Sequence, residues 1–271
     1  MNNIFIDTKD DRPIGVFDSG LGGLTVLNDL AKAFPNQRYI YLGDLANLPY
    51  GSKSKSNIIK CSISCANFLT EKNVKGIVIA CNTSSSYAYK KLKEVLTIPV
   101  YDVINPCAES VSKSNFKKIA IIGTEKTIES NLYNDLIRSL NEKIEIYNVA
   151  CPLFVPIVEE GLENSSVAIS VINMYLKNLK KLNIEGLVLG CTHYPILTKS
   201  LKNYFNNSIN IFKSGQALAD KYSNPDSSPI FSRDHSINIK YYVTDLPQRF
   251  IRYGNKFSFQ KIKKAELIKL W

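Results

Sequence analysis

Two cysteines occur in matching sequence contexts in this chain. Cys191 lies in Gly186-Leu-Val-Leu-Gly-Cys-Thr-His-Tyr-Pro195, and Cys81 lies in Gly76-Ile-Val-Ile-Ala-Cys-Asn-Thr83. A thiol can donate a proton and a thiolate can accept one, whereas a single cysteine could only remove a proton and return it. The repeated context therefore indicates two half-molecules, each of which offers one potential acid/base group.

Each of these cysteines follows a short apolar run that is typical of a buried strand. Val, Ile and Leu without polar alternation indicate a strand covered on both faces, as in a parallel sheet between helices. The cysteine would then lie at the carboxyl end of the strand, where ligands bind in open α/β sheets and the next helix directs its positive N-terminus. We therefore expect each sulfur at a place that stabilises a thiolate.

The spacing of the repeated segments indicates two similar domains. The two cysteine segments lie about 110 residues apart, and a second pair, Ile14-Gly-Val-Phe-Asp-Ser-Gly20 and Ile119-Ala-Ile-Ile-Gly-Thr-Glu125, lies about 105 residues apart. We predict an α/β fold of two similar doubly wound parallel-sheet domains related by pseudo-twofold symmetry. The expected domains are 1–101 with about 209–271, and about 102–208.

Apolar runs alternate with helical stripes along the chain, which is the rhythm of βαβ units. Besides the strand before Cys81, we expect strands at 13–18, 38–42, 97–103, 117–123, 143–149, 185–190, 208–212 and 237–243. We expect helices at 24–34, 53–72, 84–96, 127–140, 153–160 and 165–182.

Composition narrows the class of protein. The chain has 271 residues, is 45% hydrophobic and carries a net charge of +10, but its lysines are scattered among acids. This pattern favours a solvated basic surface over a nucleic-acid footprint, and it can attract a small anionic substrate. No apolar stretch approaches the ~18 residues of a membrane span, and the polar, acidic start does not resemble a signal peptide. We therefore expect a cytoplasmic protein without a nucleic-acid or membrane partner.

The six cysteines are expected to be reduced thiols, because the chain lacks a recognisable secretion signal. Cys61 and Cys65 are four residues apart in a predicted helix and so share one face. Two small core residues explain them better than a metal site, because zinc requires four ligands and the chain has only His193 and His235 as histidines. We expect no metal.

Two loops contain residues suited to binding. The glycine-rich loop Ser19-Gly-Leu-Gly-Gly23 follows the first predicted strand and is either a tight turn or an anion cradle, without the spacing of a dinucleotide or Walker loop. Asp18, at the end of that strand, could bind an ammonium group or direct a proton. The turn Pro49-Tyr-Gly51 is either a plain loop or a ligand-facing one.

Five motifs taken together resemble the glutamate racemases, of the cofactor-independent aspartate/glutamate racemase superfamily. In chain order they are Asp18-Ser-Gly-Leu-Gly-Gly23, Pro49-Tyr-Gly51, Cys81-Asn-Thr83, Cys151-Pro-Leu-Phe-Val-Pro-Ile-Val-Glu-Glu160 and Gly190-Cys-Thr-His-Tyr-Pro195. The resemblance implies interconversion of L- and D-glutamate in an active site in the cleft between the two domains. It also implies that D-glutamate is supplied for peptidoglycan precursors and that no cofactor is required.

The resemblance also implies residue roles. Cys81, assisted by Asp18, would act on the α-proton of the D-enantiomer. Cys191, assisted by His193 and Glu159, would act on that of the L-enantiomer, with Glu160 as the alternative acid. The implied substrate contacts are Asp18, Ser19, Tyr50, Gly51, Asn82, Thr83, Thr192 and His193, to which the Gly123-Thr124 turn and Thr127 could add.

Some positions depart from the family pattern. Leu45 and Asn47 replace a usual threonine and arginine, and Asn105 and Cys107 replace a usual glutamate and glycine. None of these positions lies in a motif that contacts the reacting carbon. The departures therefore leave the expected reaction unchanged and bear only on fine substrate tuning or regulation. An aspartate racemase, a related one-cysteine decarboxylase and a non-catalytic binding protein are the alternatives. The sequence leaves the oligomeric state open, a homodimer included.

Overall fold

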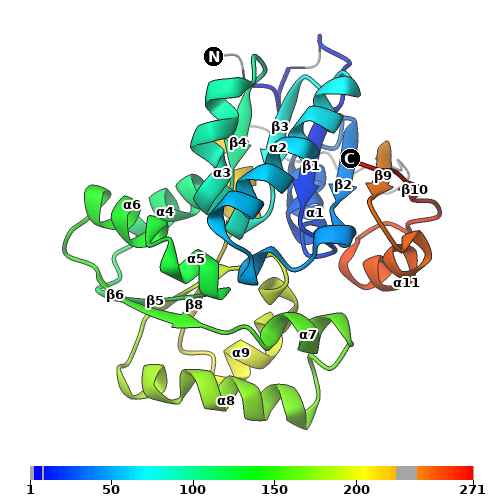
Figure 1. Cartoon of the computed structure of the whole chain (residues 1–271). Helices are drawn as coiled ribbons and strands as arrows, with labels where there is room; N and C mark the ends of the chain where they lie inside the picture. The colour runs from blue at the N-terminus through cyan, green and yellow to red at the C-terminus, as the bar shows by residue number, and fades with distance from the viewer. Residues whose placement is uncertain (1–2, 8, 224–236, 271) are drawn as a thin grey trace.

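The computed structural model describes residues 3–7, 9–223 and 237–270, which form two lobes with a parallel sheet in each (Figure 1). The upper lobe of Figure 1 combines the blue and cyan N-terminal part of the chain with the orange and red C-terminal part. The green and yellow middle of the chain forms the lower lobe. The chain therefore crosses between the lobes twice.

The first sheet, in the upper lobe, has six parallel strands in the order β10-β9-β2-β1-β3-β4. Every residue of β1, β2 and β3 is buried, as expected for apolar runs covered on both faces. The strands are β1 (Ile14–Asp18), β2 (Tyr39–Gly43), β3 (Gly76–Ile79), β4 (Val100–Asp102), β9 (Ile239–Val243) and β10 (Glu266–Leu267).

The second sheet, in the lower lobe, has the parallel order β6-β5-β7-β8 and so repeats the order β2-β1-β3-β4 of the first sheet. Its strands are β5 (Lys118–Gly123), β6 (Glu145–Ala150), β7 (Gly186–Gly190) and β8 (Asn210–Lys213). The register repeats as well, because Ile14 lies opposite Gly76 in one sheet and Ile119 lies opposite Gly186 in the other. The predicted α/β fold with two similar parallel sheets is confirmed.

The chain returns to the upper lobe later than the sequence suggested. We expected the return near residue 209, but Asn210–Lys213 is the strand β8, which pairs with β7 in the second sheet. In this pairing the apolar residues Ile211 and Phe212 lie beside Leu187 and Val188 of β7. A return to the upper lobe at residue 209 would remove these contacts. We therefore move the end of the second domain beyond Lys213 and otherwise keep the proposed division into two domains.

The helices begin and end largely where polar caps and apolar stripes indicate. Ser54, Thr124 and Ser165 each accept a backbone N–H at a helix start. The helices are α1 (Leu24–Ala33), α2 (Lys55–Glu71), α3 (Asn82–Val95), α4 (Ile104–Ser112), α5 (Glu125–Glu129), α6 (Leu132–Leu140), α7 (Phe154–Glu159), α8 (Ser166–Lys181), α9 (Thr198–Tyr204), α10 (Ser214–Tyr222) and α11 (Pro247–Phe257). Short 3₁₀ turns occur at Leu45–Asn47, Tyr50–Ser52 and Tyr194–Leu197.

The single helix expected at 127–140 is wrong, because the chain forms α5 and α6 with a break between them. Asn131 at the break has φ 56°, a left-handed conformation that asparagine tolerates better than most residues. The break turns α6 so that Tyr133 and Ile137 are buried.

All six cysteines are free and buried. Cys61 and Cys65 lie on the buried face of α2, so their interpretation as core residues is confirmed. His235, the other histidine considered as a ligand, lies outside the described residues.

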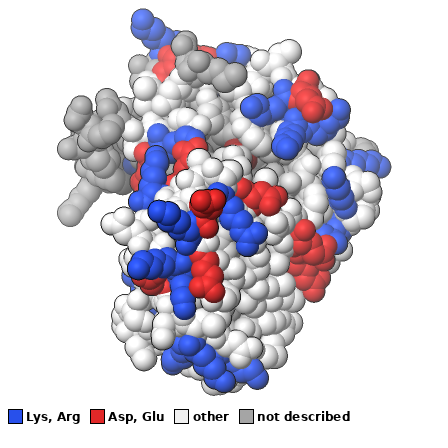
Figure 2. Space-filling view, turned by 90° about the vertical axis from the view of Figure 1, so that its left-hand side faces the viewer, with Lys and Arg blue, Asp and Glu red and all other residues white. Residues whose placement is uncertain are grey.

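Acidic and basic side chains lie next to one another on the face of the molecule shown in Figure 2. The chain has 34 Lys and Arg against 24 Asp and Glu, and on this face the basic residues are interspersed with acidic ones. Over the described ranges, no helix has the length and apolar character needed to cross a membrane.

Candidate active site

Both repeated cysteines line the same small cavity between the two sheets. Cys81 follows β3 and Cys191 follows β7, which are equivalent strands of the two sheets, and each sulfur lies where the strand order reverses. The cavity has a volume of about 20 Å³. Its lining is Ser19, Leu48, Pro49, Tyr50, Gly51, Cys81, Asn82, Thr83, Thr124, Val155, Cys191, Thr192 and His193.

Cys81 caps the N-terminus of α3 with its sulfur. Its Sγ accepts the Ser84 N–H at 3.5 Å and donates to Ser19 Oγ at 3.7 Å. Burial raises the pKa of Cys81 to about 12, and the Asp18 carboxylate adds to this, against the opposing effect of the two hydrogen bonds. Cys81 is therefore a neutral thiol at neutral pH, ready to donate a proton.

Asp18 lies behind the cavity wall and links the two lobes. Its Oδ2 accepts the Gly20 N–H at 2.9 Å, and its Oδ1 accepts the Thr192 hydroxyl at 3.2 Å. Burial raises the pKa of Asp18, while the charge of His193 and the hydrogen bonds oppose that rise. Asp18 itself does not line the described cavity, although its neighbour Ser19 does.

Cys191 lies in a chain of polar contacts with His193 and Glu159. The Cys191 sulfur is 3.9 Å from His193 Nδ1, and His193 Nε2 is 3.0 Å from Glu159 Oε1. Burial lowers the pKa of His193, but its hydrogen bonds to Cys191 and Glu159 outweigh burial and raise that pKa to about 10. His193 is therefore an imidazolium at neutral pH, and a cation next to the sulfur stabilises negative charge there.

Of the two acids considered for this role, the structure brings Glu159 to the histidine. Glu160 is exposed and lies 3.6 Å from the Arg249 guanidinium at the surface. The difference follows from α7, whose last turn directs Glu159 inward and leaves Glu160 at the helix end. The ring of Phe257, from α11, packs edge-on against His193 with the ring centres 5.9 Å apart.

The expected substrate contacts other than Asp18 all line the cavity, but their polar groups differ in availability. The Tyr50 hydroxyl donates to Asp44 Oδ2 at 2.5 Å, so its proton is engaged by a protein partner. Thr83, Thr124 and Thr127 hydrogen-bond to one another through their hydroxyls, at 2.9, 3.0 and 3.1 Å. This cluster joins α3 of the upper lobe to α5 of the lower lobe.

Two glycines allow the lobes to approach closely at the cavity. A Cβ on Gly22 would lie 2.3 Å from Thr192 Oγ1, and one on Gly51 would lie 2.7 Å from Thr124 Cβ. The glycine-rich loop proposed as a turn or an anion cradle thus also serves as a close contact with the segment after Cys191.

The sequence reasoning missed two residues that line the cavity, Leu48 and Val155. Val155 lies inside the quoted Cys151–Glu160 motif, so that motif could have pointed to it. Leu48 precedes Pro49 in a loop, and nothing in its local sequence distinguishes it from an ordinary core residue. The role of Phe257 was also missed, because it depends on a contact with residues more than sixty positions earlier.

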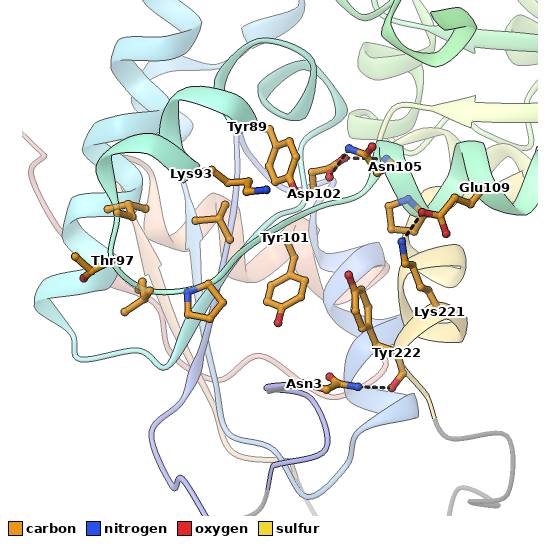
Figure 3. Close-up of a pocket in the computed structure, with 15 residues that line it drawn as sticks. Asn3, Tyr89, Lys93, Thr97, Tyr101, Asp102, Asn105, Glu109, Lys221 and Tyr222 are labelled. Atoms are coloured by element: carbon orange, nitrogen blue, oxygen red, sulfur yellow. Dashed lines mark hydrogen bonds and ion pairs between the residues drawn. The ribbon is translucent and has the colours of Figure 1, made fainter. Parts of the chain in front are cut away.

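A larger cavity, of about 540 Å³, lies away from both cysteines (Figure 3). Tyr89 and Lys93 of α3, Tyr101 of β4, and Lys221 and Tyr222 of α10 contribute to its lining. Lys93 lies about 16 Å along α3 from the cysteine end of that helix. This cavity is much larger than the one at the cysteines, but the acid/base groups lie at the other end of α3, where we place the candidate active site.

Within the ranges that the structure describes, no three His, Cys, Asp or Glu residues gather in a way that could hold a metal ion. The candidate active site combines a neutral thiol from one lobe with a sulfur beside an imidazolium from the other.

Comparison with known proteins gives the same family throughout. The sequence model of the Asp/Glu/hydantoin racemase family matches residues 14–222. A glutamate racemase of Sulfurihydrogenibium sp. is 44% identical over 264 residues, covering 95% of this chain and all of that protein. A glutamate racemase from Francisella tularensis, solved in complex with D-glutamate, superposes with TM-score 0.84 at 36% identity, covering 96% of this chain and 98% of that one.

A glutamate racemase from Thermus thermophilus, solved in complex with β-chloro-D-alanine, superposes with TM-score 0.81 at 34% identity, again covering 96% of this chain and 98% of that one. These similarities extend over both lobes and over all the segments that form the cysteine cavity. The chain therefore belongs to the Asp/Glu/hydantoin racemase family, among the glutamate racemases, and is an isomerase that acts on amino acids.

Proposed function

We propose that this protein interconverts L- and D-glutamate by proton transfer between two cysteines and the α-carbon of the substrate. The observation that carries the proposal is the position of Cys81 and Cys191, which line one cavity from equivalent strand ends of two sheets. Racemisation requires removal of a proton on one face and delivery on the other, and groups from two facing lobes supply that geometry.

The protonation states support a definite resting enzyme. Burial, together with Asp18, keeps Cys81 as a thiol, and the His193 imidazolium lies next to the Cys191 sulfur, at 3.9 Å. In this state Cys191 would remove the α-proton of L-glutamate and Cys81 would donate a proton to the opposite face. The reverse reaction starts from the opposite distribution of charge, with Cys81 as the base for D-glutamate.

The N-terminus of α3 offers a place for the α-carboxylate. The N–H groups of Asn82 and Thr83 are in the first turn of a 14-residue helix and have no partner within it. Such a terminus attracts an anion through its N–H groups and the helix dipole. A carboxylate bound there would hold the α-carbon next to Cys81.

The size of the cavity bears on substrate entry. A volume of about 20 Å³ holds roughly one water molecule, so glutamate cannot enter unless the lobes separate. The threonine cluster and the contact of Gly22 with Thr192 lie between the lobes and would open with them. Closure around the substrate would then exclude water from the reacting thiols.

The proposed substrate is glutamate, because the relatives described above are glutamate racemases and one of them was solved with D-glutamate. We propose that no cofactor takes part, because the two thiols already supply both proton transfers. The proposed role of the product is to serve peptidoglycan precursor synthesis in the cytoplasm.

A chiral assay on both enantiomers of glutamate and aspartate, in deuterated water and after dialysis against a chelator, tests the proposal. We expect racemisation of glutamate with deuterium gained at Cα, and much slower reaction with aspartate. Activity that is lost on dialysis and restored by pyridoxal phosphate or a metal would contradict the cofactor-independent mechanism. Absence of exchange at Cα would contradict racemase activity altogether.

A further inference from the structure

The side chain of Asn82 is held at both ends by protein hydrogen bonds. Its Oδ1 accepts the Tyr133 hydroxyl at 2.7 Å, and its Nδ2 donates to Ser214 Oγ at 3.3 Å. Asn82 is 1% exposed. Both ends of the amide thus hydrogen-bond to protein partners, which fixes the orientation of the side chain.

Tyr133 comes from the lobe opposite to Asn82. It lies on α6, is buried, and packs in the apolar core that contains Ile121 and Val188 of the second sheet. Burial raises the pKa of Tyr133 well above its ordinary value, so the hydroxyl stays a neutral donor. The hydrogen bond to Asn82 is therefore a fixed link between the second sheet and the first residue of α3.

The thiol of Cys107, one of the positions that depart from the family pattern, lies beside the Tyr133 hydroxyl. Burial raises the pKa of Cys107 to about 12, against the opposing effect of a hydrogen bond with Tyr133. Because this thiol is neutral, it does not draw the Tyr133 hydroxyl away from Asn82 as a thiolate would.

The neighbour of Asn82 is the proposed acid/base residue Cys81. The Cys81 sulfur accepts the Ser84 N–H and so depends on the orientation of the first turn of α3. Rotation of the Asn82 side chain away from its two partners would allow the Cys81–Asn82 peptide to turn, and the sulfur with it. A displacement of about 1 Å is enough to cost on the order of 100-fold in rate.

We propose that Tyr133 is a positioning residue that acts across the lobes, through Asn82, to orient Cys81 toward the substrate. Since Tyr133 and Asn82 belong to different lobes, the link forms only when the lobes are closed. Cys81 is thereby aligned after the substrate has been enclosed. This inference rests on the proposed two-cysteine racemisation.

Elimination from 3-chloroglutamate reads out each cysteine separately. Removal of the α-proton by one thiolate expels chloride from Cβ, and the resulting enamine tautomerises and hydrolyses to 2-oxoglutarate and ammonium. No reprotonation from the far face is required. The enantiomer that Cys81→Ser can no longer process identifies the substrate of Cys81, and the other enantiomer serves as the internal control.

Tyr133→Phe removes the hydroxyl and keeps the ring. We expect it to slow elimination from the Cys81-dependent enantiomer by about tenfold or more, and to leave the other enantiomer within about twofold of wild type. Tyr87→Phe is the matched control, because its hydroxyl also crosses between the lobes, donating to the Lys126 carbonyl at 3.0 Å. It should show no preference between the enantiomers.

Ser214→Ala releases the other end of the Asn82 amide and should give a weaker loss with the same enantiomer preference. It also provides the test if Tyr133→Phe fails to fold, as judged by thermal melting. Equal slowing of both enantiomers in each folded variant would overturn the positioning role while leaving the racemase intact. If the wild-type protein processes neither enantiomer, the proposed function itself is wrong.

Discussion

Replacing Glu159 by glutamine should move the alkaline limb of the pH–rate profile. Glu159 Oε1 lies 3.0 Å from His193 Nε2, and the two side chains are only 12% and 3% exposed. Glutamine keeps an oxygen acceptor at this place but removes the negative charge. The imidazolium would then lose the negative charge at one of the two contacts that raise the pKa of His193 to about 10 against burial.

The size of the shift follows from the strength of the lost interaction. A hydrogen bond to a charged group contributes about 1.5–3 kcal/mol, and one pKa unit corresponds to about 1.4 kcal/mol. The pKa of His193 should therefore fall by about one to two units. His193 must stay protonated to support Cys191. Activity is therefore present at pH values below the pKa of His193 and is lost as the pH rises through that pKa. The variant should lose activity at a lower pH than the wild type.

The assay is the initial rate of L-glutamate racemisation, with kcat/KM determined across neutral and alkaline pH, because this quantity reports the titration of the free enzyme. Glu160→Gln is the matched control, since it makes the same change one residue away, at an exposed side chain near Arg249. An alkaline limb that does not move in Glu159→Gln, or moves equally in Glu160→Gln, would refute the reasoning about His193.

Two further variants test the close contact of the lobes and the charge behind Cys81. Gly22→Ala should cut kcat/KM on the order of 100-fold without unfolding the protein, because its Cβ would lie 2.3 Å from Thr192 Oγ1. Gly254→Ala is the control, because its Cβ would meet only flexible side chains, at 3.1 Å. It should stay near wild type in kinetics and thermal melting. Asp18→Asn should lower the pKa of Cys81, since the carboxylate contributes to raising it. Alkylation of Cys81 followed by peptide mass spectrometry across pH should show this, and an unchanged titration would exclude Asp18 as a cause.

Sequence patterns predicted the framework of the site because that framework depends on local and repeated features. The apolar runs before Cys81 and Cys191 could be read directly as buried strands. Their repetition, together with the pair at Ile14 and Ile119, gave two similar sheets, and the structure places these pairs in the same register in each sheet. The positions of both cysteines at one cavity follow from that symmetry.

The parts that sequence could not supply depend on contacts between distant segments. Tyr133 reaches Asn82 from another lobe, and Phe257 reaches His193 from the last helix. Neither residue stands in a pattern that marks it. The boundary of the second domain was misplaced for a similar reason. The strand expected at 208–212 is present as β8, but its place in the second sheet follows from its pairing with β7.

The facial assignment of the two cysteines needs an assay that avoids a thermodynamic constraint. L- and D-glutamate have equal free energy, so any variant must lose kcat/KM equally in the two directions of racemisation. A comparison of forward and reverse racemisation therefore cannot assign the faces. Elimination from 3-chloroglutamate is irreversible, and each enantiomer requires only the thiolate on its own side.

The most direct test of the central claim is elimination by Cys81→Ser and Cys191→Ser with each enantiomer of 3-chloroglutamate. The serine hydroxyl is too weak an acid to form the anion that would replace the thiolate base at neutral pH. Each variant should therefore lose racemisation of glutamate. Cys191→Ser should still process the D-enantiomer, and Cys81→Ser should still process the L-enantiomer. Racemisation near the wild-type rate in either variant, or the same enantiomer preference in both, would contradict the two-cysteine mechanism.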